Sequence, residues 1–151
     1  MKQQIKIEPD KIHLLGVDIL KARIESDFDA LSIESTSFKF DLGFTNGFNT
    51  EEKLVRCELE IEVDKIDERN KIVAESQFTL SFVFHIENFD AFIQKGNNEN
   101  IVFDGSMAAT LGGICFSTAR GILLTRFQGT VFKDFILPVI DPRKMLEDKE
   151  G

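Results

Sequence analysis

The side chains best suited to chemistry in this chain are two histidines, two cysteines and a row of carboxylates. Nucleophilic catalysis needs a nucleophile and a base that lie close together and are oriented by a third group. His13 and His85 stand alone, because neither has another histidine or a cysteine at the spacing of a metal site. We therefore expect no catalytic residue, no metal and no cofactor, and an enzyme is the weakest of the functional classes considered below.

The cysteines, Cys57 and Cys115, do not have the spacing of a disulfide framework. Cys57 falls in a predicted strand and Cys115 in a predicted helix, where a reduced cysteine acts as a small buried hydrophobe. Reduced thiols agree with a cytoplasmic protein. The N-terminal stretch 1–20 also lacks the apolar run and the small-residue cleavage site of an export signal.

A row of carboxylates occupies every second position of one segment: Glu58, Glu60, Glu62 and Asp64. The positions between them are apolar, which predicts a strand with one face on the core and one in water. Paired acid and base carboxylates need environments that push their pKa values apart. A hydrated surface is therefore the favoured interpretation, and a docking patch for a basic partner is the alternative.

Length and composition exclude several classes of protein. The chain has 151 residues, of which 42% are hydrophobic and 29% are charged, as in globular domains rather than disordered chains. Its formal net charge of −8 argues against a nucleic-acid partner, which needs concentrated Lys and Arg. No uninterrupted apolar run approaches the ~18 residues that span a bilayer, so no membrane partner is expected.

Alternation of apolar and polar residues predicts four strands. The stretch from Ile12 to Ile33 alternates irregularly, which indicates a long strand with a bulge near Gly16 or Ala22. A helix over 12–26 is the competing interpretation. Three later segments alternate more cleanly: 38–44, 54–64 and 71–86.

Turn-forming residues separate these strands. Thr45-Asn46-Gly47 predicts a turn after the second strand, and 67–70 predicts a hairpin turn in which Asn70 tolerates positive φ. Residues 87–94 are expected to form a short turn or a single helical turn, and 95–100 a polar loop.

The stretch from Asp104 to Gly129 predicts one long helix, capped by Asp104 or Ser106 and ended by Gly129. Apolar residues at spacings of three and four predict its buried stripe: Met107, Leu111, Ile114, Cys115, Thr118, Ile122 and Leu123. Small residues on its flanks allow close packing on both sides. A brief last helix is expected from Asp141-Pro142. Strands followed by helices predict an α+β fold with an antiparallel sheet.

Three motifs in this C-terminal half carry a family resemblance: Phe116-Ser117-Thr118-Ala119-Arg120, Gly129-Thr130-Val131-Phe132 and Leu137-Pro138-Val139-Ile140-Asp141. In order and spacing they resemble the C-terminal half of the SecB export chaperone family. The length allows a single domain over 1–151, and the polar residues 1–10, which end in Pro9, are expected to form a loose arm. The resemblance implies a four-stranded antiparallel sheet with a crossover connection between the first two strands, one long helix and a short C-terminal helix.

Fifteen phenylalanines without Trp or Tyr supply more large apolar groups in loops and edge elements than a small core usually needs. The simpler interpretation is that they fill the core. In the family, the corresponding segments line a groove that holds unfolded polypeptide, and aromatic rings suit that task because they lose little entropy on contact. The resemblance assigns this groove to Phe38, Phe40, Phe44, Phe48, Phe132, Phe135, Leu137 and Val139.

The resemblance also implies partners. Asp18 and Glu75 match acidic positions that dock a SecA-like translocation ATPase, although Ala22 stands near a second such position. An antitoxin is therefore the alternative partner. The resemblance further implies a homo-oligomer, a dimer or a dimer of dimers, with contacts at Gly112, Gly113, Phe116, Ser117, Arg120 and Gly121.

We therefore expect an ATP-independent chaperone for unfolded or non-native polypeptides, serving export or a toxin–antitoxin pair. The alternative is a non-chaperone binding domain of the same fold that takes a dedicated protein partner or a small apolar ligand.

Overall fold

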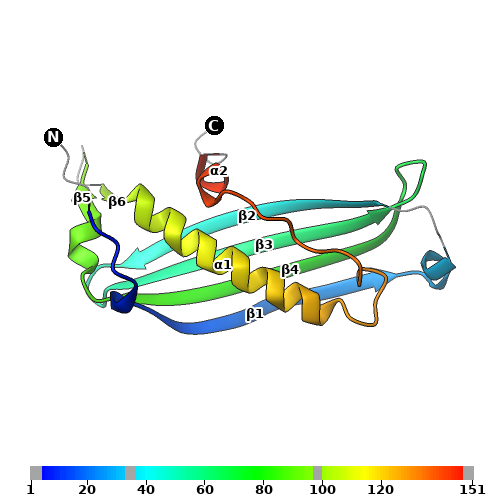
Figure 1. The fold of residues 1–151 in the computed structure, drawn as a ribbon, viewed down its shortest axis with the longest axis horizontal. Helices are drawn as coiled ribbons and strands as arrows, with labels where there is room; N and C mark the ends of the chain where they lie inside the picture. Colours follow the sequence, from blue (N-terminus) through cyan, green and yellow to red (C-terminus); the bar gives the residue numbers. More distant parts are fainter. Residues whose placement is uncertain (1–4, 33–36, 97–99, 148–151) are drawn as a thin grey trace.

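A computed structural model shows four long antiparallel strands with one helix lying diagonally across one face of the sheet (Figure 1). It describes residues 5–32, 37–96 and 100–147. The strands are β1 (Ile12–Ser26), β2 (Ser37–Asn49), β3 (Leu54–Ile66) and β4 (Ile72–Ile86). Their order in the sheet is β1-β4-β3-β2, so the connection from β1 to β2 crosses from one edge to the other. The predicted fold class and crossover are confirmed.

The remaining elements are shorter except for the long helix. They are the 3₁₀ turns η1 (Pro9–Lys11), η2 (Phe28–Ser32) and η3 (Phe89–Phe92), the small strands β5 (Ile93–Lys95) and β6 (Ile101–Phe103), and the helices α1 (Gly105–Arg126) and α2 (Pro142–Glu147). The single helical turn η3 was predicted, and the two-stranded β5–β6 hairpin was not. We call the stretch 127–141, which leads from α1 back to α2, the return segment; Figure 1 shows it running between α1 and β2.

β1 is a strand rather than the alternative helix, and it carries two irregularities. Its pairing with β4 shifts register between Leu14 and Gly16 and again between Ile19 and Lys21. The first bulge lies where Gly16 predicted it, and the second lies at Leu20 rather than at Ala22. Each extra residue reverses the face of the side chains that follow, which explains the irregular alternation of the sequence.

The turn predicted at Thr45-Asn46-Gly47 is wrong, because β2 continues to Asn49. Asn46 pairs with Cys57 and Gly47 with Arg56 on β3, so cross-strand pairing overrides the local turn preference. The chain turns later, where the Asn49 side-chain oxygen accepts hydrogen bonds from the backbone N–H groups of residues 51 and 52 at 3.0 and 3.1 Å. The hairpin turn at Asn70 is confirmed, with φ of +60°.

α1 begins at the predicted cap and ends before the predicted stop. The Asp104 carboxylate accepts a hydrogen bond from the Met107 backbone N–H at 2.9 Å, which satisfies a donor that the helix leaves free. The helix ends at Arg126, and Gly129, with φ of +77°, supplies the turn that follows.

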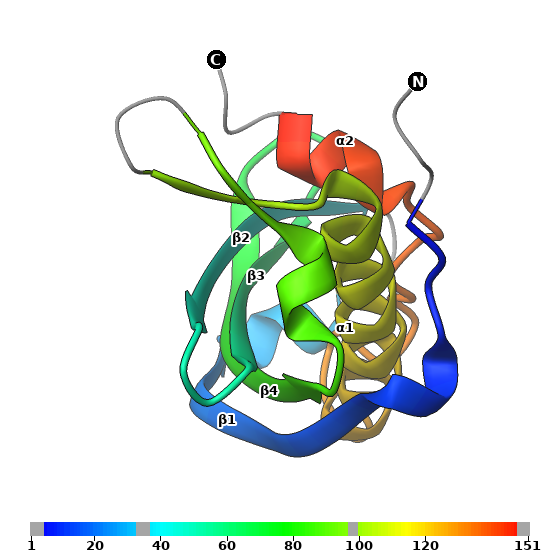
Figure 2. The same ribbon diagram turned by 90° about the vertical axis from the view of Figure 1, so that its left-hand side faces the viewer.

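The buried face of α1 is rotated from the predicted stripe. Ile114, Thr118 and Ile122 are only half-buried, whereas small residues and one ring replace them in the core: Ala108, Gly112, Phe116 and Ala119. Figure 2 shows the reason, since the sheet curves around the helix and brings its strands close to α1. A concave sheet favours the side of the helix where short side chains allow that approach.

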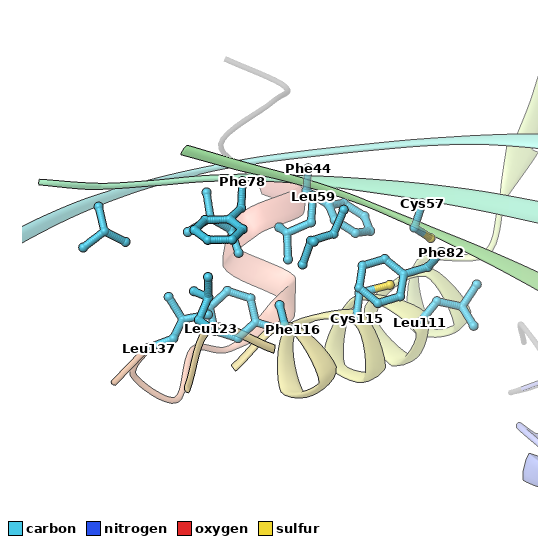
Figure 3. Packing of buried hydrophobic residues seen from close by; sticks show 14 of the residues in the cluster. Phe44, Cys57, Leu59, Phe78, Phe82, Leu111, Cys115, Phe116, Leu123 and Leu137 are labelled. Atoms are coloured by element: carbon cyan, nitrogen blue, oxygen red, sulfur yellow. The ribbon is translucent and has the colours of Figure 1, made fainter. Parts of the chain in front are cut away.

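By length and composition, α1 could also cross a membrane, contrary to the sequence expectation. The expectation counted uninterrupted large apolar residues, whereas the mean hydropathy of α1 stays high because its apolar residues are interrupted mainly by small uncharged ones. In the structure α1 is the core helix. Figure 3 shows Cys57 and Phe82 of the sheet pointing toward Leu111 and Cys115 of the helix, and all four side chains are buried.

Candidate functional site

The phenylalanines expected to form one groove belong to two separate clusters. The first, which we call the return-segment cluster, joins Phe38 and Phe40 of β2 to Phe135, with ring centroids 5.4 and 5.9 Å from that ring. The second, the hairpin cluster, joins Phe48 to Phe89 and Phe103, at 6.2 and 5.9 Å. Phe40 and Phe48 lie eight residues apart on one strand, a separation of about 27 Å.

Four of the predicted groove residues lie inside the subunit core. Phe44, Phe132, Phe135 and Leu137 are only 3%, 0%, 7% and 1% exposed. The return segment folds back over the sheet and α1, and its inward side chains fill the space between them. These four residues therefore support the surface from beneath and do not line it in the free subunit.

The other predicted groove residues remain accessible. Phe40 is 39% exposed, Phe48 is 36% exposed and Val139 is 90% exposed, while Phe38 is half-buried. Ile136, at 60% exposure, lies on the return segment with Val139 and was missed. Its only sequence signal is its position between Phe135 and Leu137, which are both buried. We call Phe40, Ile136 and Val139 the return-segment patch.

Arg120 holds the return segment against α1. Its Nε donates to the backbone oxygen of Leu137 at 2.7 Å and its Nη2 donates to that of Pro138 at 3.1 Å. The guanidinium carbon also lies 5.8 Å from the centre of the Phe116 ring. Arg120 was predicted at an oligomer contact, but in the structure it fixes the segment that presents the patch.

The other predicted oligomer residues divide between the core and the surface. Gly112 and Phe116 are buried under the sheet, so that prediction is wrong for both in the subunit as described. Gly113 approaches α2, because a Cβ placed there would lie 3.4 Å from the Pro142 side chain. Ser117 and Gly121 are exposed on the outer side of α1.

The two predicted docking acids lie on the sheet face opposite the buried side chains of β4. That face is the one that α1 leaves uncovered (Figure 2). Asp18 pairs with Ser81, and Glu75 pairs with Glu25. Because Ser81 and Glu75 are six residues apart on β4, the two acids are separated by about 20 Å along the sheet. Glu75 also lies 4.0 Å from the Arg23 guanidinium. The structure therefore brings them to one face without bringing them together.

The row of β3 carboxylates lies on this same open face, as predicted, opposite the buried Cys57, Leu59, Ile61 and Val63. Asp64 pairs with Glu75 across the sheet. Partial burial, together with the charges of Glu75 and Glu62, raises the pKa of Asp64 above its ordinary value. Repulsion between neighbouring carboxylates is therefore present in the folded state.

The histidines and cysteines each form a pair. His13 and His85 face one another on β1 and β4, with ring centroids 6.0 Å apart, and His13 Nε2 lies 2.9 Å from the Glu87 carboxylate. Cys57 and Cys115 are both reduced and buried. The pKa of the Cys115 thiol is raised, mainly by its contact with the Cys57 thiol and secondly by its burial. In the described part of the chain, no three His, Cys, Asp or Glu side chains are grouped to hold a metal.

A cavity of about 620 Å³ lies at the end of the molecule where α1 begins. Its walls are the segment 5–7, η3, the β5–β6 hairpin and the first turn of α1. The lining is mixed, with apolar Phe92, Val102 and Phe103 beside polar Gln94 and Ser106. We call this space the arm cavity.

Comparison with known proteins shows a likeness of fold. No protein-family model matches the sequence, and no curated protein matches it either. Among solved structures, the SecB-like chaperone Rv1957 of Mycobacterium tuberculosis, in complex with a ChAD peptide from the HigA1 antitoxin, is similar with a TM-score of 0.60. The sequence identity is 8%, over 87% of this chain and 91% of that chain. A second solved structure, a protein of unknown function from Streptococcus agalactiae, aligns over 85% of this chain and 97% of that chain at 10% identity. Its TM-score of 0.27 is too low to indicate a shared fold.

Proposed function

We propose that this chain is the subunit of an ATP-independent, SecB-like chaperone that holds non-native polypeptide. The observation that carries the proposal is the return-segment patch, in which Phe40, Ile136 and Val139 present large apolar side chains to solvent. The SecB-like fold supports it, and the sequence resemblance implies a client groove on the segment that carries Val139.

The patch suits clients of varied sequence. An exposed ring or branched side chain contributes contact area without requiring a particular hydrogen-bond pattern. Its rigid support comes from Phe135 and Leu137 beneath it and from the Arg120 hydrogen bonds, so little order is lost when a client binds. Binding of apolar client segments here would keep those segments from one another.

Two kinds of partner fit the proposal. The similar solved chaperone binds an antitoxin peptide, so we place an antitoxin segment among the clients of this chain in a cytoplasmic toxin–antitoxin system. Docking of a SecA-like ATPase is the other proposal, and it would use Asp18 and Glu75. Their separation along the sheet requires a partner that spans both.

A homo-oligomer belongs to the same proposal. β1 forms one edge of the sheet, and it exposes Leu14, Leu15 and Leu20 by 43%, 61% and 52%. A long edge strand with exposed apolar side chains is an aggregation hazard unless it is paired. We propose that β1 pairs with β1 of a second copy and extends the sheet across the dimer.

The test measures how far the chain suppresses the aggregation of a client. Aggregation is monitored by light scattering, in the absence of nucleotide. A chemically unfolded client is diluted into buffer with an equal concentration of subunits. We expect the wild-type chain to suppress scattering, and Val139→Asp with Phe40→Asp to lose most of that effect.

Ile72→Asp is the matched control, because Ile72 is 47% exposed at the start of β4, outside the return-segment patch. Equal suppression by both variants would remove the patch from the mechanism. No suppression by the wild-type chain would overturn the proposal and favour a binding domain with a dedicated partner.

A further inference from the structure

The N-terminal arm is anchored by alternate side chains. The arm is defined here as residues 5–8, which have no helix or strand. Ile5 and Ile7 are half-buried and pack against the core, whereas Lys6 between them is exposed. The expected loose arm is therefore packed from Ile5 onward, while residues 1–4 lie outside the described residues.

Side chains alone hold this segment in place. Among the described residues, no backbone hydrogen bond joins Ile5, Lys6 or Ile7 to the hairpin or to α1. The next backbone contacts come later, where Lys11 bonds to Glu8 and Glu87 bonds to Lys11. Segments with few buried contacts and few backbone hydrogen bonds open at low free-energy cost. The arm can therefore leave its seat without unfolding the sheet.

The seat of the arm has apolar side chains among polar ones, and it is only partly filled. The arm forms one wall of the arm cavity, and Figures 1 and 2 both place it beside the start of α1. The opposite wall includes Val102, which is 55% exposed. Beyond the cavity, the half-exposed Phe48 ring lies 5.9 Å from the ring of Phe103, another wall residue.

We infer that the seat of Ile5 and Ile7 is a second polypeptide-binding site, occupied in the free subunit by the chain's own N-terminal arm. The inference rests on the proposed function and adds a regulator to it. The resident segment defines the ligand class: an extended stretch in which large apolar side chains alternate with a basic or polar one. The net charge of −8 favours clients whose intervening residues are basic.

Such an arrangement makes the arm a competitor of the client. A site that is open for only a fraction of the time binds with its intrinsic affinity reduced by that fraction. Emptying the seat should therefore tighten client binding, and a free copy of the arm sequence should weaken it. A client that displaces the arm also gains the unfilled cavity volume for its own side chains.

The experiment measures binding of a fluorescein-labelled client by anisotropy, with the full chain throughout. The client is kept unfolded by reduction and carboxamidomethylation of its cysteines. We expect Ile5→Ser combined with Ile7→Ser to bind it about 10-fold more tightly than wild type, for an arm that occupies its seat about 90% of the time. Lys6→Ser is the matched control and should bind like wild type.

Two further measurements keep the inference testable if the double variant folds poorly. Val102→Asp, on the cavity wall, should weaken client binding, whereas Ile101→Asp, its neighbour on the other face of β6, should not. A synthetic peptide of residues 5–9, IKIEP, should compete with the client for the wild-type chain.

The outcomes separate this inference from the proposed function. Client binding that is unchanged by the isoleucine substitutions, by Val102→Asp and by the peptide would overturn the arm site and leave the chaperone proposal standing. Absence of client binding in every variant would overturn both.

Discussion

Arg120 shows how one side chain supports the proposed binding surface from a position outside it. The guanidinium fork reaches two successive backbone oxygens, of Leu137 and Pro138, on the segment that carries Val139. Lysine has one ammonium group and could not reproduce both directed bonds. Arg120 is therefore a positioning residue, and its loss should affect stability as well as client binding.

Substituting Arg120→Met removes both hydrogen bonds but keeps much of the side-chain stem. We expect the free energy of unfolding to fall by about 2 kcal/mol, since each bond has a charged donor. Urea denaturation measures the change. Arg126→Met, exposed in the last turn of α1, is the control and should change little. An Arg120→Met variant as stable as wild type would contradict this role.

The raised pKa of Asp64 predicts how the stability of the fold depends on pH. Burial and its acidic neighbours raise its pKa in the folded state above the ordinary value of 3.8. Below that ordinary value the carboxyl is protonated in both states and costs nothing. As pH rises through the higher folded-state pKa, the folded state loses stability relative to the unfolded state.

Asp64→Asn should therefore stabilise the fold at pH 7 by about 0.5 kcal/mol, the scale of like charges paired across strands. The gain should shrink toward zero as pH falls below the aspartate range, and also in high salt. Urea denaturation at several pH values measures it, with Glu68→Gln in the hairpin turn as the matched charge removal. A gain that persists at low pH would show that charge is not its source.

At the scale of elements, β1 carries apolar side chains that remain exposed within one subunit. It is long, it lies at an edge, and its bulges leave Leu15 and Leu20 exposed. Within one subunit nothing in the described residues pairs with its outer edge. These features explain why the strand is proposed to meet a second copy.

The proposed pairing of β1 predicts that substitutions in this strand lower the mass of the protein particle in solution. Wild-type protein should elute at the mass of a dimer or a dimer of dimers in size-exclusion chromatography with multi-angle light scattering. Leu15→Asp with Leu20→Asp should shift it to the monomer, because a charge at each bulge opposes strand pairing. Phe28→Asp, on η2, is the control. A wild-type monomer would contradict the proposed pairing.

The elements themselves could largely be predicted from the sequence. Alternation of apolar and polar residues located the strands. The carboxylates at every second position of β3 identified its solvent face, because successive side chains of a strand point to opposite faces of the sheet. The turn at Asn46-Gly47 could not be judged locally, since its outcome depends on pairing with β3. The buried face of α1 was equally ambiguous, because apolar residues surround most of that helix and only the curved sheet selects one side.

Which phenylalanines remain exposed could not be predicted from their spacing. Phe38 and Phe40 share one face of β2 with Phe44, yet their exposure differs because the return segment covers the strand unevenly. That cover depends on Arg120 and on rings distant in sequence. The resemblance pointed to these segments, and only the three-dimensional packing separates their exposed side chains from the buried ones beneath.

The whole molecule has two unlike sheet faces. One face carries α1, the return segment and the aromatic clusters, and the other carries the carboxylates of β3 with Asp18 and Glu75. Under the proposed function, this division would place a client and a basic partner on opposite sides of the sheet. The return-segment patch and the seat of the arm would let a long client make contacts far apart along the subunit, which raises overall affinity without a stronger single contact.

The most direct measurement is the affinity of the purified wild-type chain for one polypeptide in its unfolded and its native form, without nucleotide. Fluorescence anisotropy of the labelled polypeptide gives both values under the same conditions. The account predicts saturable binding of the unfolded form, lost on Val139→Asp with Phe40→Asp, and no binding of the native form. Equal binding of both forms, or binding of neither, would contradict it.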